Sequence, residues 1–325
     1  MMLTHLVNVS GGKDSTACYL LALERGRPFR AIMADTGHEH PATMEYAAAL
    51  GARTGGPQVE FVAADFSDRI RRKRVVVETK WRAEGIPETW IERARAVLEP
   101  TGNPFLDLCI WKGRFPSRRA QFCTEFLKTD AIWRAVLEPA LARGPVVQWL
   151  GVRRDESPAR RNVPRLSRVR TPGMPVLAYF RPLVDWTAEQ CFALHAHHGL
   201  EPNPLYREGM GRVGCFPCIN ASKGELAQIA LRYPDAFARI AEWERIVAEA
   251  SKRGASTFFH SGVTPEGRAM ARQGISGGRD GPSYPGALEV ARWALTDIGG
   301  RQTSWILDLE REEGLACSSQ YGLCE

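Results

Sequence analysis

The stretch VNVSGGKDSTACYLLALERG, residues 7–26, carries the strongest structural signal in the chain. A short apolar run ends at two glycines, and Lys13, Asp14 and Ser15 then open a helix-like segment. Glycines let backbone N–H groups approach an anion, and the start of a helix adds favourable partial charge. Ser10 and Ser15 can add hydroxyl donors. The stretch therefore predicts a strand, a phosphate-binding loop and a helix.

This loop fits neither of two common phosphate-binding patterns. A Walker A loop needs a glycine, four residues and then Gly-Lys-Ser/Thr. Here Gly12 and Lys13 are followed by Asp14, and Val7 stands at the first glycine position. The pattern G-x-G-x-x-G is also absent from this stretch. Lys13 supplies positive charge, and we expect Asp14 either to hold a magnesium ion or to cap the helix. The alternative interpretation is an ordinary glycine-rich turn.

Strand-like and helix-like segments alternate along the first half of the chain. Strands are predicted at residues 3–9, 29–37, 58–66 and 145–153, and helices at 15–26, 42–54 and 128–144. This alternation predicts an α/β fold, a doubly wound and mainly parallel sheet with helices on both faces. Ligands bind such sheets at the carboxyl ends of the strands. The polar segments SGGKDS, ADTGHEHP and GVRRDES follow three of these ends, so residues 1–200 are predicted to form a nucleotide-binding domain.

The pattern changes beyond about residue 185. Helices are predicted at 187–199, 223–252 and 285–298, whereas residues 253–286 are rich in Gly, Ser and Pro and are predicted to be irregular. The chain ends in CSSQYGLCE. We therefore expect residues 201–325 to form a mixed helical and irregular, cysteine-rich part with a mobile tail.

The composition is that of a soluble protein. The chain has 325 residues, of which 44% are hydrophobic and 25% charged, and no apolar run reaches the length of a membrane span. No signal peptide is recognisable, so we expect a cytoplasmic protein whose 8 cysteines stay reduced. The net charge of +6 and pI near 9.0 fit an anionic partner, either a nucleotide or a nucleic acid.

Several segments resemble one known superfamily. SGGKDS resembles the PP-loop of the adenine nucleotide alpha hydrolases, a HUP-like superfamily that includes ATP pyrophosphatases and the phosphoadenosine phosphosulfate (PAPS) reductase family. Segments that resemble the reductase family follow in the same order: DTGHEHPAT (35–43), FCTEFLKTDAI (122–132), GVRRDESPAR (151–160) and VGCFPCI (213–219). The resemblance covers roughly residues 3–220.

The resemblance implies a nucleotide site and its residues. The phosphate-binding residues would be Ser10, Gly11, Gly12, Lys13, Asp14 and Ser15. Asp35 would lie near the reacting phosphate or metal, and Gly151, Arg153 and Arg160 match the arginine-bearing loop, whose planar guanidinium groups suit phosphate or sulfate. We expect catalytic roles for Lys13, Asp14, Asp35 and Arg153.

Two activities within the superfamily are compatible with these motifs. In one, the loop binds ATP with Mg²⁺, a substrate oxygen attacks the α-phosphorus, pyrophosphate leaves, and the adenylated substrate takes up sulfur or nitrogen. In the other, a cysteine thiolate attacks a sulfonucleotide and releases sulfite. By family resemblance, reductases usually have a decayed loop, whereas this loop is intact, which favours ATP. A nucleotide sensor or complex subunit without turnover is a third interpretation.

The cysteines predict a metal centre. Cys215 and Cys218 form a C-x-x-C whose spacing lets two thiolates bind one zinc ion or iron–sulfur cluster. The resemblance adds Cys123 as a ligand and implies a [4Fe–4S] cluster rather than zinc. Phe122 stands where cluster-bearing relatives have a second cysteine, so Cys109 is the nearest replacement, with Cys317 and Cys324 as alternatives. Reduced loop cysteines without metal are the simpler interpretation.

The tail and the remaining cysteines have different expected roles. The tail loosely resembles the mobile C-terminal segment of sulfonucleotide reductases, which makes Cys324 a candidate catalytic thiol, although the residue order differs. Cys317 or Cys324 could instead complete the cluster or accept sulfur from a donor protein, and an idle tail is the alternative. Cys18 and Cys191 lie within apolar helical patterns and are predicted to be core residues.

Two stretches are strongly basic. DRIRRKR (68–74) and the segment 153–170 are both rich in arginine. Arginines that do not face the nucleotide could bind the backbone of a nucleic-acid acceptor, and a solvated surface is the alternative. His38 and His40 are expected in a loop that lines the nucleotide pocket. The sequence does not identify the acceptor, the sulfur donor or the oligomeric state.

Overall fold

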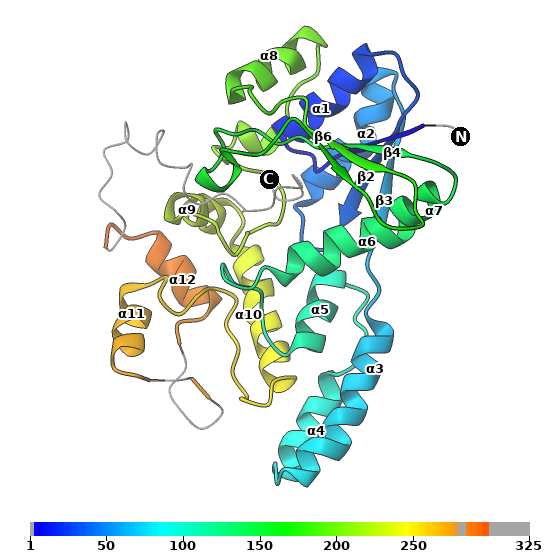
Figure 1. Ribbon diagram of the computed structural model, residues 1–325. Coiled ribbons are helices and arrows are strands. Elements are labelled where there is room, and N and C mark those ends of the chain that lie inside the picture. Colours follow the sequence, from blue (N-terminus) through cyan, green and yellow to red (C-terminus); the bar gives the residue numbers. More distant parts are fainter. Residues whose placement is uncertain (1–2, 276, 279–283, 299–325) are drawn as a thin grey trace. The chain divides into compact units, whose positions relative to one another are not determined.

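The computed structural model describes residues 3–275, 277–278 and 284–298 (Figure 1). These residues form two compact units. The first consists of residues up to 64 together with 124–216, and the second of residues 65–123 together with 217–298. This division differs from the predicted boundary at residue 200, because the chain leaves the first unit after its third strand and returns at residue 124. The two units are described separately.

The first unit is built on a six-stranded sheet (Figure 1). The strand order is β3-β2-β1-β4-β6-β5, and only β5 is antiparallel to its neighbour. The strands are β1 (Thr4–Asn8), β2 (Arg30–Asp35), β3 (Val59–Ala63), β4 (Val146–Trp149), β5 (Leu166–Val169) and β6 (Leu177–Phe180). The chain adds strands on one side of β1 and then on the other. This change of direction between β1 and β4 is where doubly wound sheets bind ligands.

Helices cover both faces of this sheet (Figure 1). On one face, α1 (Lys13–Glu24), α2 (Pro41–Thr54) and α8 (Ala188–His197) pack on a core that includes Val7, Met33 and Trp149. On the other face, residues 124–141 pack on Leu6 and Ile32. Side chains of neighbouring strand residues point to opposite faces, so β1 contributes to both cores. The predicted doubly wound, mainly parallel α/β sheet is therefore confirmed.

The helical segment 124–141 contains two stretches of wide, π-helical turns. It comprises η2 (Thr124–Thr129), α6 (Asp130–Ile132), η3 (Trp133–Leu137) and α7 (Glu138–Leu141). The helix therefore begins four residues before the predicted start at residue 128. Isolated π-turns inside helices often occur at functional sites. Lys128 lies in the first of these stretches.

The second unit is helical in its described part. Its elements are α3 (Ser67–Val76), η1 (Val77–Trp81), α4 (Glu88–Val97), α5 (Pro104–Lys112), α9 (Lys223–Arg232), α10 (Pro234–Glu249), α11 (Pro265–Arg272) and α12 (Ala287–Ala294). The Phe105 ring lies 5.7 Å from that of Trp243 and 6.0 Å from that of Phe258, which places three aromatic rings at the centre of the core. The segment 253–286, predicted to be irregular, contains α11. In the described part of the chain, no helix has both the length and the apolar character that a membrane span requires.

Candidate nucleotide site

The glycine-rich loop after β1 is closed by its two serines. The Ser15 hydroxyl accepts hydrogen bonds from the Ser10 N–H (3.1 Å) and the Ser10 hydroxyl (2.9 Å), and it donates to the Gly12 carbonyl (3.1 Å). Gly11 has φ +78°, and a Cβ there would lie 2.6 Å from Thr43 Cγ2. Only glycine fits both the left-handed conformation and this close approach. The loop is therefore fixed in shape before any ligand binds.

Residues about 190 positions later in the sequence support this loop. The Asn203 amide donates to the Gly11 carbonyl and to the Thr43 hydroxyl, each at 3.2 Å. The Tyr206 hydroxyl accepts the Lys13 N–H at 2.9 Å. Asn203 directly precedes the short 3₁₀ helix η5 (Pro204–Tyr206), and Tyr206 ends it. Both residues belong to the first unit. The sequence interpretation assigned no role to either residue.

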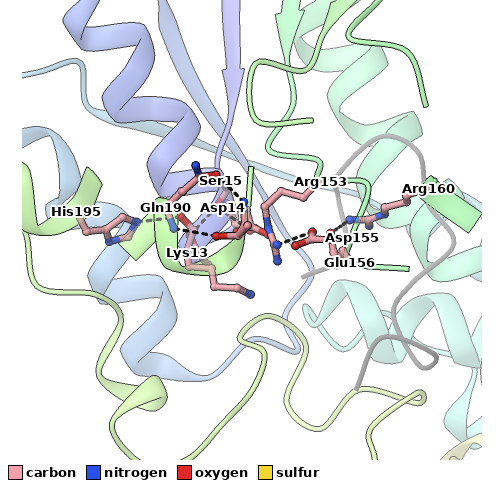
Figure 2. Close-up of polar contacts among 12 residues, drawn as sticks. Lys13, Asp14, Ser15, Arg153, Asp155, Glu156, Arg160, Gln190 and His195 are labelled. Atoms are coloured by element: carbon pink, nitrogen blue, oxygen red, sulfur yellow. Dashed lines mark hydrogen bonds and ion pairs between the residues drawn. The ribbon is translucent and has the colours of Figure 1, made fainter. Parts of the chain in front are cut away.

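His195 supports the same loop from α8 (Figure 2). Its Nε2 lies 2.9 Å from the Lys13 carbonyl oxygen, and because a carbonyl can only accept, Nε2 is the protonated nitrogen. Burial lowers the pKa of His195, which outweighs its bond to Lys13, so the imidazole is neutral at pH 7. The Lys13 ammonium lies 5.6 Å from the centre of the Tyr206 ring. Lys13 is thus held by backbone and side-chain contacts at once.

Asp14 forms a buried ion pair with Arg153 (Figure 2). Its carboxylate is 0% exposed and lies 2.9 Å from Arg153 Nε, while Arg153 Nη1 lies 2.5 Å from Asp155. Burial opposes the charged guanidinium, but the two carboxylates outweigh it and raise the pKa of Arg153 above its ordinary value. The helix N-cap is Gly12, so Asp14 does not cap α1. In this structure Asp14 pairs with Arg153. The sequence did not predict this pairing for either residue.

Gly151 allows the end of β4 to contact the first turn of α1. A Cβ at this position would lie 2.7 Å from the Asp14 carbonyl oxygen and 2.8 Å from Ser15 Cα. Real Cβ atoms do not approach backbone this closely, so a larger residue would push the two segments apart. Gly151 therefore brings Arg153 within reach of Asp14.

Arg160 belongs to the same loop but faces another carboxylate. Its side chain is fully buried and forms an ion pair with Glu156 (Figure 2). It ends the short 3₁₀ helix η4 (Pro158–Arg160). Two ion pairs, Arg153 with Asp14 and Arg160 with Glu156, therefore fix the loop that follows β4. The sequence interpretation expected Arg160 to bind the nucleotide directly.

A pocket lies at the carboxyl ends of β1 and β2. It is lined by Val9, Ser10, Met33, Ala34, Glu39, Lys128 and Gly214. Ser10 is the residue that the pocket shares with the predicted phosphate-binding set. Asp35, which ends β2, does not line it; its carboxylate accepts the Gly37 N–H at 2.9 Å and shapes the turn. In this structure Asp35 therefore supports the loop, and Glu39 is the carboxylate at the pocket wall.

Glu39 and Lys128 are the acidic and the basic side chain that line the pocket. The Glu39 carboxylate accepts from the Thr36 hydroxyl (2.7 Å) and the Thr36 N–H (3.1 Å). Burial raises the pKa of Glu39, and the nearby Lys128 ammonium opposes this shift. Lys128 is itself buried, at 8% exposure. A buried ammonium beside Ser10 can attract an anionic group and stabilise negative charge that develops on it.

The DTGHEH loop is joined to the first cysteine of the C-x-x-C. Glu39 and Cys215 form an antiparallel β-bridge, and the Phe216 N–H donates to the His38 carbonyl at 2.7 Å. The Phe216 ring packs edge-on against His40, at 4.6 Å between ring centres. Of this loop only Glu39 lines the pocket, whereas His38 is buried and the His40 ring caps α2. The loop therefore lines the pocket, as expected, through Glu39 and not through either histidine.

Cys109 and Cys123 lie near each other in the second unit. Burial raises the pKa of the Cys109 thiol well above its ordinary value, and the proximity of Cys123 raises it further. The role of Cys109 as a metal ligand beside Cys123 stays a prediction. Cys18 and Cys191 are fully buried in the first unit, which confirms their prediction as core residues.

The predicted ligands belong to both units, Cys215 to the first and Cys109, Cys123 and Cys218 to the second. Among the residues that the structure describes, no group of three or more His, Cys, Asp or Glu side chains is arranged to hold a metal ion. The Cys218 sulfur accepts the Asn220 N–H at 3.5 Å. Cys317 and Cys324 lie outside the described residues. The [4Fe–4S] cluster and its zinc alternative therefore stay predictions.

Five residues of the site were not identified from the sequence: Glu39, Lys128, His195, Asn203 and Tyr206. Two of them stood within quoted motifs. Glu39 lies in DTGHEHPAT and Lys128 in FCTEFLKTDAI. Asn203 and Tyr206 lie in NPLY, a loop whose contacts with Gly11 and Lys13 no local pattern reveals.

The family model for the phosphoadenosine phosphosulfate reductase domain matches residues 4–93 and 107–221. The chain belongs to this family. The match spans the whole PP-loop, the Glu39 and Lys128 pocket and the NPLY loop. Membership supports an enzyme of the adenine nucleotide alpha hydrolase superfamily, either a sulfonucleotide reductase or a related PP-loop enzyme.

The chain is also similar to individual proteins. An uncharacterized 37.8 kDa protein of Escherichia phage 186 is 45% identical over 99% of this chain and 96% of its own. An adenosine 5′-phosphosulfate reductase from Deinococcus radiodurans is 50% identical over 13% of this chain and 16% of its own. Another from Allochromatium vinosum is 29% identical over 33% of this chain and 37% of its own. A crystal structure of phosphoadenylyl-sulfate reductase from Candida auris in a phosphate complex covers 66% of this chain and 82% of its own, with 15% identity and a TM-score of 0.39.

Proposed function

We propose that this protein is a PP-loop ATP pyrophosphatase that adenylates a substrate and couples this step to sulfur transfer. The observation that carries the proposal is the intact and pre-shaped loop. Gly11 takes the left-handed conformation, Ser10 and Ser15 close the loop, and a glycine N-cap leaves no side chain over the start of α1. Such a loop suits the β- and γ-phosphates of ATP, which leave together as pyrophosphate.

The reaction divides naturally between the loop and the pocket. A substrate nucleophile attacks the α-phosphorus, and the bond from that phosphorus to the bridging oxygen breaks. The loop and Lys13 stabilise the negative charge on the departing pyrophosphate. Lys128, buried beside Ser10, stabilises charge on the α-phosphate oxygens, and Glu39 keeps the Lys128 ammonium in place. A sulfur nucleophile from a donor protein then attacks the substrate atom that carries the adenylated oxygen, and AMP leaves with that oxygen.

The cofactors follow from this chemistry. Mg²⁺ would accompany the triphosphate, since hard oxygen ligands suit it. An iron–sulfur cluster on Cys215, Cys218, Cys123 and Cys109 would supply the sulfur step or its electrons. These assignments are part of the proposal and depend on metal analysis of the purified protein.

A binding series tests the assignment without knowledge of the acceptor. The affinity of the protein is measured for ATP, ADP and AMP in the presence of Mg²⁺. We expect affinity to fall in that order, and Ser10→Ala to weaken ATP binding about tenfold or more while AMP binding changes little, because charge-assisted hydrogen bonds to phosphate are each worth about 1.5–3 kcal/mol. Equal affinity for the three nucleotides would contradict the proposal.

A sulfonucleotide reductase is the second candidate. The family model and the adenosine 5′-phosphosulfate reductases among the relatives favour it. In that case a sulfonucleotide occupies the same pocket, and a thiolate, for which Cys324 is the candidate, attacks its sulfur. The thiolate displaces AMP and becomes S-sulfonated, and a dithiol reductant in the assay then releases sulfite as the cysteine sulfur forms a disulfide. Sulfite formation from adenosine 5′-phosphosulfate and a dithiol by the full chain, lost in Cys324→Ser, combined with no preference for ATP over AMP, would establish this activity instead.

A further inference from the structure

The stretch from residue 157 to residue 184 is basic throughout. It contains six arginines and no aspartate or glutamate: Arg160, Arg161, Arg165, Arg168, Arg170 and Arg181. Three of them have structural partners. Arg160 and Arg181 are buried, and Arg165 pairs with Asp185 at 2.7 Å. The other three are exposed.

Arg161, Arg168 and Arg170 present unused positive charge. Their guanidinium groups make no hydrogen bond or ion pair with any residue in the described part of the chain. They lie on and beside β5, the last strand of the sheet, together with the exposed apolar residues Leu166 and Val169. We call Arg161, Leu166, Arg168, Val169 and Arg170 the β5 surface.

The opposite edge of the same sheet provides a comparison. On β3 the exposed Glu60 accepts two hydrogen bonds from Arg30, at 2.8 and 2.6 Å, so its charge is neutralised within the fold. Edge strands carry charged residues to prevent pairing with other chains, but either sign serves that purpose. A single sign along 28 residues (157–184) exceeds what edge protection requires.

The basic stretch 68–74 provides a second comparison. Arg74 pairs with Glu78 and Glu99, Arg71 pairs with Asp68, and Lys73 donates to the Ile110 carbonyl at 2.7 Å. Arg69 lies over the Trp111 ring, 4.3 Å from its centre. Most of this stretch therefore serves the helices of its own unit. Two arginine-rich stretches of the sequence therefore give two different surfaces.

We propose that the β5 surface binds the sugar–phosphate backbone of a nucleic acid. Guanidinium groups pair with phosphate, and exposed apolar side chains beside them can pack against bases or sugars. Arg168 and Arg170 are two positions apart, which separates them by about 7 Å in an extended strand and places them on one side. Both guanidinium groups can therefore contact phosphates of the same nucleic-acid strand.

The surface and the nucleotide site share one unit of the fold. The loop that follows β4 carries Arg153 and Arg160 and leads directly into β5. A nucleic acid bound along β5 would be the acceptor that the adenylation step requires. This assignment of the acceptor rests on the proposed function, whereas binding to the β5 surface does not.

The test measures binding of a fluorescent, mixed-sequence oligonucleotide by anisotropy at about 50 to 200 mM salt, a range over which phosphate contacts weaken strongly. Single-stranded DNA, duplex DNA and RNA of the same sequence are compared. The variant Arg168→Glu/Arg170→Glu is compared with Arg72→Glu/Lys80→Glu, which makes the same change in net charge at exposed positions of the second unit. The variant Arg168→Lys/Arg170→Lys retains the charge.

We expect Arg168→Glu/Arg170→Glu to weaken binding about tenfold or more and to reduce the slope of log affinity against log salt by between about 1 and 2. The control pair should have a much smaller effect, and the lysine pair should retain the slope. Equal losses in both glutamate variants, or no binding by the unaltered protein, would overturn the proposal.

The same variants separate this proposal from the proposed function. Arg168→Glu/Arg170→Glu should keep the ATP-to-AMP affinity ratio of the unaltered protein, because neither residue touches the PP-loop. If neither the unaltered protein nor the variants prefer ATP to AMP, but oligonucleotide binding follows the expected pattern, the β5 surface is supported and the ATP assignment is wrong. If the ratio is present and the two glutamate variants bind alike, the surface fails and the ATP assignment stands.

Discussion

The two compact units accommodate buried ionisable groups in different ways. Around the candidate site in the first unit, three of them have an opposite charge nearby: Asp14 with Arg153, Glu156 with Arg160, and Glu39 near Lys128. In the second unit, Lys73 and Glu244 are held by backbone groups. Paired charges can stay ionised at neutral pH, whereas a charge that has only dipoles around it shifts its pKa. Paired charges suit a site that binds anions. Charged groups held only by backbone dipoles make the free energy of unfolding depend on pH.

Breaking a pair in the first unit should have the largest effect. Asp14→Ala leaves the Arg153 guanidinium buried with Asp155 as its remaining carboxylate, and losing one partner of a buried pair costs about 3–5 kcal/mol. We expect a lower urea midpoint as well as lost ATP binding. Because Asp14 is fully buried, its loss should affect the fold as well as the binding of nucleotide.

A double variant and a control separate folding from binding in this case. Asp14→Leu/Arg153→Leu removes both charges. Its loss of free energy of unfolding should be smaller than the sum of the losses in the two single variants. Ser10→Ala, at the pocket wall, should bind ATP poorly while its urea midpoint stays close to that of the unaltered protein. A stable Asp14→Ala variant would show that Arg153 does not depend on Asp14.

A smaller effect is expected at Glu244 in the second unit. Burial raises the pKa of this carboxyl to about 7, although it accepts N–H groups from Phe258 (2.7 Å) and Ala287 (2.9 Å). The folded state therefore keeps a proton that the unfolded state loses near pH 4.5. The corresponding stability is present below pH 4.5 and is lost as the pH rises through 7, a change on the order of 1–3 kcal/mol.

Glu244→Gln tests this dependence because the amide keeps the acceptor oxygen and cannot ionise. Urea unfolding is measured at pH 5 and pH 8 for both proteins. The unaltered protein should lose more stability between these values than the variant does. Parallel pH profiles would mean that Glu244 titrates normally and that its environment is wetter than the structure indicates.

The smallest of these effects is expected at Lys73. Burial lowers its pKa to about 8, so between pH 8 and 10.5 the unfolded state binds a proton that the folded state does not. Its contribution to stability therefore rises with pH across that window. The long side chain can move its ammonium towards water, which reduces the change to about 1 kcal/mol. Lys73→Met should flatten the rise in urea midpoint between pH 7.5 and 10.

Most of the sheet could be predicted from the sequence, since β1 to β4 are apolar runs separated by amphipathic helices. The strands β5 and β6 were missed because each has only four residues, and the arginines of β5 conceal its strand character. The boundary at residue 200 differed for another reason. Residues 65–123 form helices that could equally belong to the first unit, and only contacts between distant segments assign them to the second.

The site was predictable as a loop but not as a set of contacts. SGGKDS identified the positions of Ser10, Gly11 and Ser15, because glycine and hydroxyl residues between a strand and a helix have few other uses. The pairing of Asp14 with Arg153 joins residues 139 positions apart, and a local pattern carries no information about such a partner. The same reason explains why Tyr206 was missed and why Arg160 was assigned to the nucleotide.

The support of the PP-loop by residues near 200 has a consequence for how the protein is made. Gly11 and Lys13 form hydrogen bonds with Asn203, Tyr206 and His195, at sequence separations of 182 to 193 residues. Contacts this distant close large loops and form late in folding. During synthesis the phosphate-binding loop emerges among the first residues, yet its supports emerge only after almost two thirds of the chain. The nascent protein therefore has no finished nucleotide site until translation has passed residue 206.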